Sequence, residues 1–221
     1  MWQLPQLSSI RRSKMLVRAV LFDLDGVLLD SKDTWYEAFN DTIKKFGLRG
    51  ISKKEFEERF WGPDLRHNIG ELGLNEAAVR FCLRRQLELV EKMRLFPDAR
   101  GVLAAVHQKY KTGLVTNTPK KNTLRIIEHF RLGKYLDVVV TGDDVSRGKP
   151  NPEILLKACD ALAVRPAEAV LVGDTGSDVE AARRAGCFII LKNERGAPSA
   201  SAVPVVQRLS EILALLEDLT T

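Results

Sequence analysis

The chain reads VRAVLFDLDG over residues 17–26, an apolar run followed at once by two aspartates. The run from Val17 to Phe22 lacks the alternation of a half-exposed strand, which favours a strand covered by helices on both faces. Asp23 and Asp25 then emerge together at the end of this strand, where desolvation and mutual repulsion are costly for a carboxylate pair. We therefore expect a cation, a reacting group or strong hydrogen-bond donors to compensate these two charges.

The pattern changes along the chain and predicts two structural parts. The segment after the first strand has several helical stretches and almost no strand-like run; we expect helices over Thr34–Phe46, Ser52–Phe60 and Asn75–Leu95. From residue 97 onward, strand-like runs alternate with helical ones, as in βαβ units of a parallel sheet. The predicted strands there are Gly113–Thr116, Leu136–Thr141, Ala169–Val172 and Cys187–Leu191, and the predicted helices are Ala99–Tyr110, Lys121–Arg131, Glu153–Leu162, Asp178–Ala185 and Val205–Leu219.

These elements predict an α/β fold: a doubly wound, Rossmann-like parallel-sheet core with an inserted α-helical module. We assign residues 17–30 and 97–221 to the α/β core and residues 31–96 to the helical module. Asp98 stands where the chain returns to the core and is expected to cap the next helix. Residues 1–16 read as a flexible basic N-terminal extension.

Composition excludes several classes of protein. The 221 residues are 45% hydrophobic, enough for a substantial core, and carry a formal net charge of +5. Four of the 34 basic residues are Arg11, Arg12, Lys14 and Arg18; without them 30 basic residues stand against 29 acidic ones. The rest of the chain is therefore nearly neutral, which disfavours nucleic acid as a partner.

No stretch has the pattern of a secretory signal or of a membrane-spanning helix, which needs about 18 apolar residues. We therefore expect a cytoplasmic protein without a membrane partner, and an alternative start at Met15 is compatible with the sequence. The cysteines and histidines are widely spaced and suggest neither disulfides nor a zinc site; they are Cys82, Cys159, Cys187, His67, His107 and His129.

Polar residues follow several of the apolar runs, and ligands of open parallel sheets bind beyond the carboxyl ends of the strands. Besides the first acidic pair, these sets are Thr116-Asn117, Lys149, and the loop from Asp174 to Asp178. Carboxylate oxygens without histidine or thiolate suit Mg²⁺. A hydroxyl, backbone amides near a helix start and an ammonium suit the oxygens of a phosphoryl group. The combination predicts a magnesium-dependent site for phosphoryl chemistry.

Four motifs in order, DLDGV (23–27), VTN (115–117), GKP (148–150) and GDTGSD (173–178), resemble phosphatases of the haloacid dehalogenase superfamily. The similarity is to the phosphoglycolate phosphatase-like and β-phosphoglucomutase-like branch with a helical cap. It implies that the helical module, residues 31–96, is an inserted α-helical cap domain and that residues 17–30 and 97–221 form the α/β catalytic core. It implies a phosphoric monoester hydrolase that forms an aspartyl-phosphate. The implied catalytic residues are Asp23 as nucleophile, Asp25 as general acid and base, Thr116 and Lys149; the implied phosphate-binding residues are Thr116, Asn117 and Lys149. The implied Mg²⁺ ligands are Asp23, the backbone carbonyl of Asp25, and Asp174, with Asp178 acting through water or by orienting Asp174.

The resemblance also implies that the cap selects a small phosphorylated metabolite of the phosphoglycolate or sugar-phosphate type. Gly62 lies in the most loop-like part of the cap, and Arg66 is a candidate for binding a carboxylate or second phosphate, or else a solvated arginine in a helix start. Trp35, Tyr36 and Phe39 are candidates for lining the site entrance, but aromatic residues at this spacing more often form a core. Many members of the family have threonine where this chain has Val27, which weakens the assignment to glycolate phosphate.

Two alternatives remain open at this stage. A phosphomutase of the β-phosphoglucomutase type uses the same kind of site and returns the phosphoryl group to its substrate. A phospho-receiver signalling module also places acidic residues, a hydroxyl and a lysine around Mg²⁺, but receivers lack an inserted helical block. Either a monomer or a homodimer is compatible with the sequence.

Overall fold

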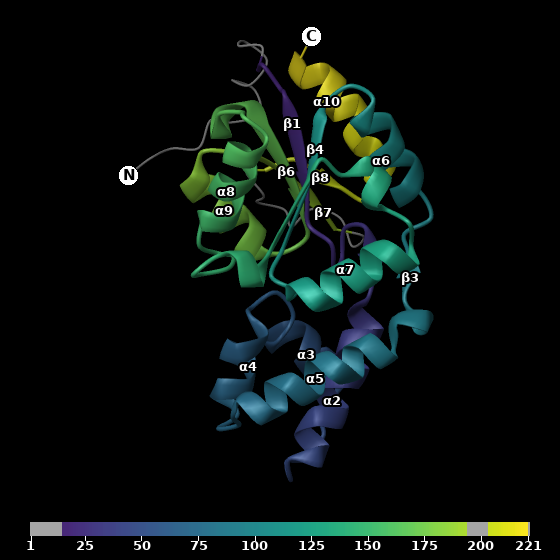
Figure 1. Ribbon diagram of the computed structural model, residues 1–221, viewed down its shortest axis with the longest axis vertical. Coiled ribbons are helices and arrows are strands. Elements are labelled where there is room, and N and C mark those ends of the chain that lie inside the picture. Colours follow the sequence, from purple (N-terminus) through teal and green to yellow (C-terminus); the bar gives the residue numbers. More distant parts are fainter. Residues whose placement is uncertain (1–14, 194–202, 221) are drawn as a thin grey trace.

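The computed structural model describes residues 15–193 and 203–220, so most of the predicted N-terminal extension lies outside the described residues. The chain forms a larger α/β lobe and a smaller helical lobe (Figure 1). The larger lobe contains a six-stranded sheet in the order β5-β4-β1-β6-β7-β8, and all neighbouring strands are parallel. Its strands are β1 Ala19–Phe22, β4 Lys111–Thr116, β5 Val138–Thr141, β6 Ala169–Gly173, β7 Phe188–Lys192 and β8 Val205–Val206.

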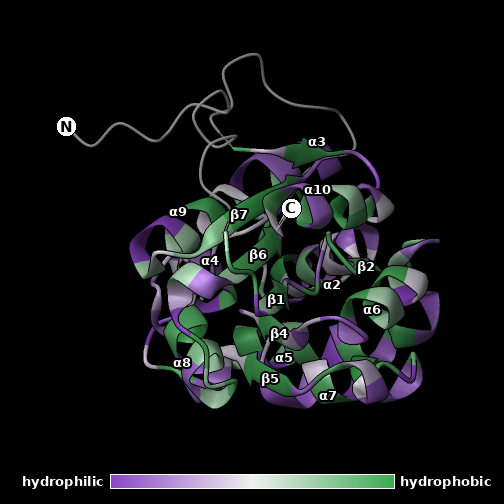
Figure 2. Cartoon of the chain, turned by 90° about the horizontal axis from the view of Figure 1, so that it is seen from above, coloured by the Kyte–Doolittle hydropathy of each residue, from purple (hydrophilic) through white to green (hydrophobic). Residues whose placement is uncertain are grey.

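Helices cover both faces of this sheet, as the continuous apolar strands predict (Figure 2). In β1, Val20 and Phe22 pack into the core on one face, whereas Ala19 and Leu21 pack into the core on the other. The first face is covered by α6 Ala99–His107, α7 Lys120–His129 and α10 Ile212–Thr220; the second is covered by α8 Glu153–Ala161 and α9 Gly176–Ala185. The doubly wound core predicted from the sequence is confirmed.

The smaller lobe is helical and is inserted in the sequence between β1 and the remaining strands of the core sheet. It consists of α2 Lys32–Lys45, α3 Lys53–Arg59, α4 Leu65–Glu71 and α5 Glu76–Glu88. These helices have their own apolar core, in which the rings of Phe39 and Phe60 lie 4.9 Å apart between centroids. At the base of the lobe, β2 Leu29–Asp30 pairs antiparallel with β3 Arg94–Leu95. This two-stranded ribbon brings both ends of the insertion together.

The structure corrects several predicted elements. The helix predicted over residues 75–95 ends at Glu88, because the last two residues of that range pair with β2. The helix predicted from residue 205 begins at Ile212, because Val205–Val206 extends the sheet beside β7. Helix α4 was not among the predicted helices; it begins directly after the loop-like stretch around Gly62. Asp98 does not cap α6 with its side chain; Oδ2 instead accepts a hydrogen bond from the backbone N–H of Ser210 at 2.7 Å.

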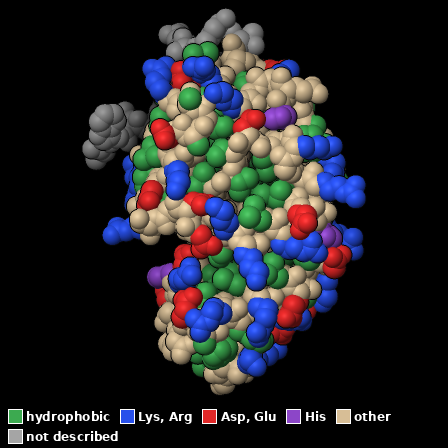
Figure 3. Space-filling view, in the orientation of Figure 1, with side chains coloured by type: hydrophobic (Ala, Val, Ile, Leu, Met, Phe, Trp, Pro, Cys, Tyr) green, Lys and Arg blue, Asp and Glu red, His purple; other side chains and the backbone are tan. Residues whose placement is uncertain are grey.

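Basic and acidic side chains are interspersed over both lobes on the face shown in Figure 3, with no large patch of one sign. This distribution agrees with the near-neutral count of the sequence beyond the N-terminal extension. All three cysteines are buried and free. In residues 15–193 and 203–220, no helix combines the length and apolarity that crossing a membrane requires.

Candidate active site

The carboxyl ends of the central strands bring the predicted polar residues to one edge of the sheet. Asp23 follows β1, Thr116 ends β4 and Asp174 follows β6, and these three strands are neighbours. Lys149 reaches the same place from the segment between β5 and α8. Together with Asp25 and Asn117, they line a pocket between the core and the cap. The sequence therefore predicted the floor of this pocket correctly, although the roles of its residues stay predictions.

A buried lysine lies between two carboxylates at the centre of the floor. The ammonium of Lys149 is 2.9 Å from Oδ1 of Asp23 and 2.7 Å from Oδ1 of Asp178, and the lysine is only 4% exposed. Burial alone would lower the pKa of Lys149, but the charges of Asp178 and Asp23 raise it above its ordinary value. The lysine therefore stays charged and fixes the position of the Asp23 carboxylate.

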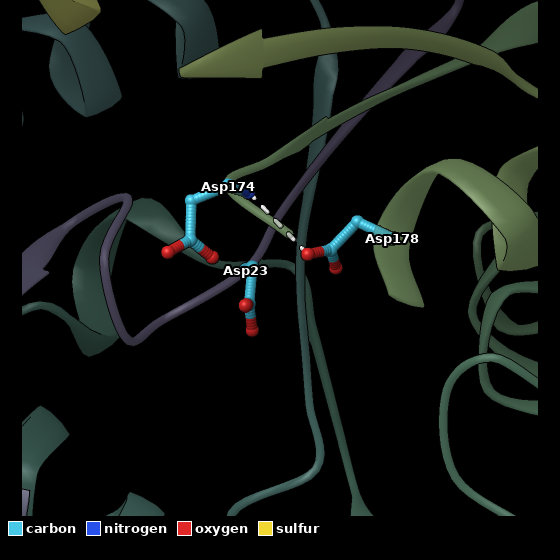
Figure 4. A group of neighbouring side chains, drawn as sticks. All are labelled: Asp23, Asp174 and Asp178. Atoms are coloured by element: carbon cyan, nitrogen blue, oxygen red, sulfur yellow. Dashed lines mark hydrogen bonds between the residues drawn. The ribbon is translucent and has the colours of Figure 1, made fainter. Parts of the chain in front are cut away.

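Three carboxylates form a compact acidic cluster at this edge (Figure 4). Asp23, Asp174 and Asp178 each offer an oxygen, and these oxygens lie within 4.8 Å of one another. Burial and the neighbouring Asp178 charge raise the pKa of Asp174 to about 7, and burial raises the pKa of Asp23 well above its ordinary value. When ionised, the three carboxylates exceed the single Lys149 charge by two negative charges.

This arrangement fits a divalent cation. Oδ1 of Asp174 is buried and has no hydrogen-bond partner among the described residues. An unmet carboxylate oxygen beside a surplus of two negative charges is what a bound divalent cation compensates. Such an ion would withdraw electron density from a phosphoryl oxygen.

Asp178 is fully buried, and both its oxygens already have partners. Oδ1 contacts the Lys149 ammonium, and Oδ2 accepts hydrogen bonds from the backbone N–H groups of Asp174 and Thr175 and from the Thr175 hydroxyl. Burial opposes ionisation, but the ammonium and these donors hold its pKa below the ordinary value. Asp178 thus fixes the lysine and the loop that carries Asp174. These contacts favour orientation of Asp174 over direct metal coordination, and the role of Asp178 stays a prediction.

The backbone between the paired aspartates also depends on this cluster. Gly26 has φ +80°, a left-handed conformation that other residues rarely adopt. A Cβ atom at this position would lie 2.1 Å from Oδ2 of Asp174. The glycine of the DLDG motif is therefore required both for the turn and for the close approach of Asp174.

Asp25 is held by three donors, none of which was predicted. Its Oδ1 accepts hydrogen bonds from the Ser31 hydroxyl at 2.5 Å and the indole N–H of Trp35 at 2.9 Å. Its Oδ2 accepts one from the Thr118 hydroxyl at 2.8 Å. Trp35, Tyr36 and Phe39 all pack in or against the cap core, as predicted. Trp35 and Phe39 also line the pocket, which was the alternative that the sequence left open.

Thr116 and Asn117 organise the neighbouring turn. The Thr116 hydroxyl accepts a hydrogen bond from the backbone N–H of Thr118 at 3.1 Å. The Asn117 side chain accepts from the backbone N–H of Lys149 at 2.8 Å and donates to its carbonyl at 2.9 Å. These two hydrogen bonds join the loop of Asn117 to the loop that carries Lys149. The sequence predicted a role only for the backbone amide of Asn117, and this side-chain contact was not predicted.

The cap contributes one predicted residue to the pocket and excludes another. Gly62 lines the pocket with φ +103°, next to Thr175 of the core. Arg66 does not line the pocket; its side chain is 55% exposed and lies 3.4 Å from Glu76. The Asp64 cap begins α4 just before Arg66 and places it away from the site. The expectation that Arg66 contacts substrate is therefore not supported.

Trp61, which was not predicted as a site residue, reaches from the cap to the acidic cluster. Its indole N–H donates to Oδ2 of Asp174 at 3.0 Å. A tryptophan beside the loop glycine was the available signal, but its direction could not be read from the sequence.

Comparison with known proteins agrees with this geometry. The family model described as haloacid dehalogenase-like hydrolase matches residues 20–192. A phosphorylated carbohydrates phosphatase of Thermotoga maritima is 33% identical, covering 91% of this chain and 99% of that protein. The pyrophosphatase PpaX of Bacillus cereus is 32% identical, covering 78% of this chain and 81% of that protein. The structure of CbbY of Rhodobacter sphaeroides in complex with phosphate superimposes with a TM-score of 0.80 at 24% identity, covering 91% of this chain and 99% of that one. The chain belongs to the haloacid dehalogenase-like hydrolases.

Proposed function

We propose that the chain is a Mg²⁺-dependent phosphatase that hydrolyses a small phosphorylated metabolite through an aspartyl-phosphate on Asp23. The observation that supports this most directly is the position of Asp23. Its carboxylate lies at the floor of the pocket, 2.9 Å from the Lys149 ammonium and inside the acidic cluster. Asp25 lines the same pocket and is held by three donors. A nucleophile and a second, separately positioned carboxylate are what two-step phosphate transfer needs.

The proposed reaction has two displacements at phosphorus. A carboxylate oxygen of Asp23 forms a bond to phosphorus while the bond to the ester oxygen breaks, and Asp25 gives its proton to the departing alkoxide. Water then attacks the same phosphorus; Asp25 takes a proton from that water, and the bond between phosphorus and Asp23 breaks. Inorganic phosphate and an alcohol are the products, and both aspartates return to their starting states.

The remaining residues of the floor hold the transferred group in this proposal. Lys149 and the Thr116 hydroxyl face phosphoryl oxygens, joined by the backbone N–H of Asn117. The Mg²⁺ ion would be held by the carboxylates of Asp23 and Asp174 and by the backbone carbonyl of Asp25. Asp178 supports this set by fixing the lysine and the Asp174 loop.

Release of inorganic phosphate tests the proposal. Purified protein with Mg²⁺ is incubated with p-nitrophenyl phosphate and a panel of phosphorylated metabolites, and Asp23→Asn is assayed beside the matched surface variant Asp160→Asn. We expect turnover in the native protein and in Asp160→Asn, its loss in Asp23→Asn, and its loss on chelation. Unchanged turnover in Asp23→Asn would reject the mechanism. Formation of a phosphate positional isomer without net phosphate release would instead identify a phosphomutase.

A further inference from the structure

The cap side of the pocket is almost entirely apolar. Its wall consists of aromatic and aliphatic side chains from α2, α3 and the segment leading into α4, namely Trp35, Phe39, Phe56, Phe60, Trp61, Pro63 and Leu65. Among the described residues that line the pocket, Lys149 alone carries a positive charge, and it already lies between two carboxylates. The wall therefore offers packing surface and no counter-charge.

Two cations contact aromatic rings of this wall without lining the pocket. The Arg59 guanidinium lies over the Phe60 ring at 4.9 Å from its centroid and pairs with Glu55. The Lys32 ammonium lies 5.3 Å from the Trp61 ring centroid and lines a separate hollow beside the pocket. Neither residue lines the pocket itself. A second anionic group on a substrate would thus meet apolar rings instead of a compensating charge, at a cost in desolvation.

One polar side chain stands in this apolar wall with an unmet hydrogen-bonding atom. Asn68, in α4, is 3% exposed and lines the pocket. Its Nδ2 donates to the backbone carbonyl of Phe60 at 2.8 Å, and its Oδ1 has no hydrogen-bond partner among the described residues. Because a carbonyl can only accept, the amide nitrogen must face Phe60, which leaves the oxygen as the free atom. A buried acceptor without a donor is costly, so a ligand donor is the natural partner.

We propose that Asn68 is a specificity-determining residue whose Oδ1 accepts a hydrogen bond from a hydroxyl on the leaving group of the substrate. This inference rests on the proposed phosphatase function and names its substrate class, a phosphate monoester of a small neutral sugar or polyol. The C–H groups of such a leaving group pack on the aromatic wall, and one hydroxyl donates a hydrogen bond to Oδ1 of Asn68. Pyrophosphate and phosphoglycolate are disfavoured, because each would place a further negative charge against an uncompensated wall and a carbonyl oxygen.

Three small esters separate these contributions. Glycerol 3-phosphate carries hydroxyls on a neutral three-carbon group, propyl phosphate has the same carbon chain without them, and 2-phosphoglycolate carries a carboxylate. The kcat/KM of each is measured with Mg²⁺ for the native protein and for Asn68→Leu. We expect the native protein to prefer glycerol 3-phosphate over propyl phosphate about tenfold, the effect of one good hydrogen bond. Phosphoglycolate and pyrophosphate are expected to be poorer substrates than glycerol 3-phosphate.

In Asn68→Leu, the preference for glycerol 3-phosphate over propyl phosphate is expected to fall close to one. The matched control is Asn122→Leu, which removes a similarly buried asparagine that donates to the backbone carbonyl of Leu83 at 2.9 Å. Asn122 does not line the pocket, so its variant should keep the native preference while showing a comparable loss of thermal stability. If Asn68→Leu does not fold, the native protein still tests the proposal, because equal kcat/KM for glycerol 3-phosphate and propyl phosphate would reject the hydroxyl contact.

The possible results distinguish the two proposals. Absence of phosphate release from every ester, p-nitrophenyl phosphate included, would reject the proposed function. Phosphate release with an unchanged preference in Asn68→Leu would leave the phosphatase intact and reject the role of Asn68. A native preference for phosphoglycolate or pyrophosphate would reject the neutral substrate class.

Discussion

Replacing Thr118 by valine is expected to slow the hydrolysis of alkyl phosphates much more than that of aryl phosphates. The change keeps the shape of the side chain and removes the hydroxyl that donates to Oδ2 of Asp25 at 2.8 Å. A hydrogen bond to a charged group is worth about 1.5–3 kcal/mol. The donors Ser31 and Trp35 still hold the other oxygen of Asp25, so we take the lower value, which corresponds to about a tenfold loss in rate.

Comparing two leaving groups makes this prediction specific to Asp25, the proposed proton donor. An alkoxide must be protonated as it departs, whereas p-nitrophenolate leaves without a proton, so only the alkyl ester depends on a well-positioned Asp25. Because kcat/KM reports the steps up to the first irreversible one, we expect an approximately tenfold decrease for glycerol 3-phosphate and little change for p-nitrophenyl phosphate. Thr42→Val, which removes a buried hydroxyl that donates to the Ala38 carbonyl within α2, serves as the control. Equal losses for both substrates, or none for the alkyl ester, would refute the positioning role of Thr118.

Three further outcomes follow from the same contacts. Asp178→Asn removes a buried carboxylate that pairs with Lys149 and should lower the free energy of unfolding in urea by about 3 kcal/mol. Gly26→Ala forces a Cβ against Asp174 and should raise the Mg²⁺ concentration that gives half-maximal activity; an unchanged Mg²⁺ titration would contradict this. Partial burial would raise the pKa of Asp144, but a threonine hydroxyl, a backbone N–H and a lysine lower it to about 2. Asp144→Asn should therefore cost about 1 kcal/mol at pH 7, and the difference from the native protein should shrink as pH falls from about 4 toward 2.

The floor of the pocket could be predicted because each of its parts is a local pattern. Asp23, Thr116 and Asp174 each follow or end an apolar run, and parallel strands place such positions at one edge without any knowledge of side-chain direction. The same local reasoning located the helices that cover the sheet. It did so because apolar residues recur along each of these helices at helical spacing.

Most of the missed features depend on contacts between separate parts of the chain. Val205–Val206 forms a strand only because β7 offers a free edge, and Arg94–Leu95 only because β2 lies beside it. The Thr118 hydroxyl reaches Asp25 across 93 positions of sequence. The sequence left two places open for Arg66, the substrate or solvent in a helix start, because its direction depends on where α4 begins; the structure shows the second.

The cap completes the active site as well as covering it. Trp35 of α2 donates to Asp25, and Trp61 of the segment between α3 and α4 donates to Asp174, so one lobe supplies hydrogen bonds to two carboxylates at the edge of the other. Asn68 lies on that same lobe, and displacement of the cap would therefore break both indole contacts and remove the proposed hydroxyl acceptor in one motion. A substrate whose leaving group satisfied Asn68 would stabilise the arrangement in which Asp25 and Asp174 are held in place. In this proposal, two tryptophans couple recognition in the cap to positioning of the core carboxylates.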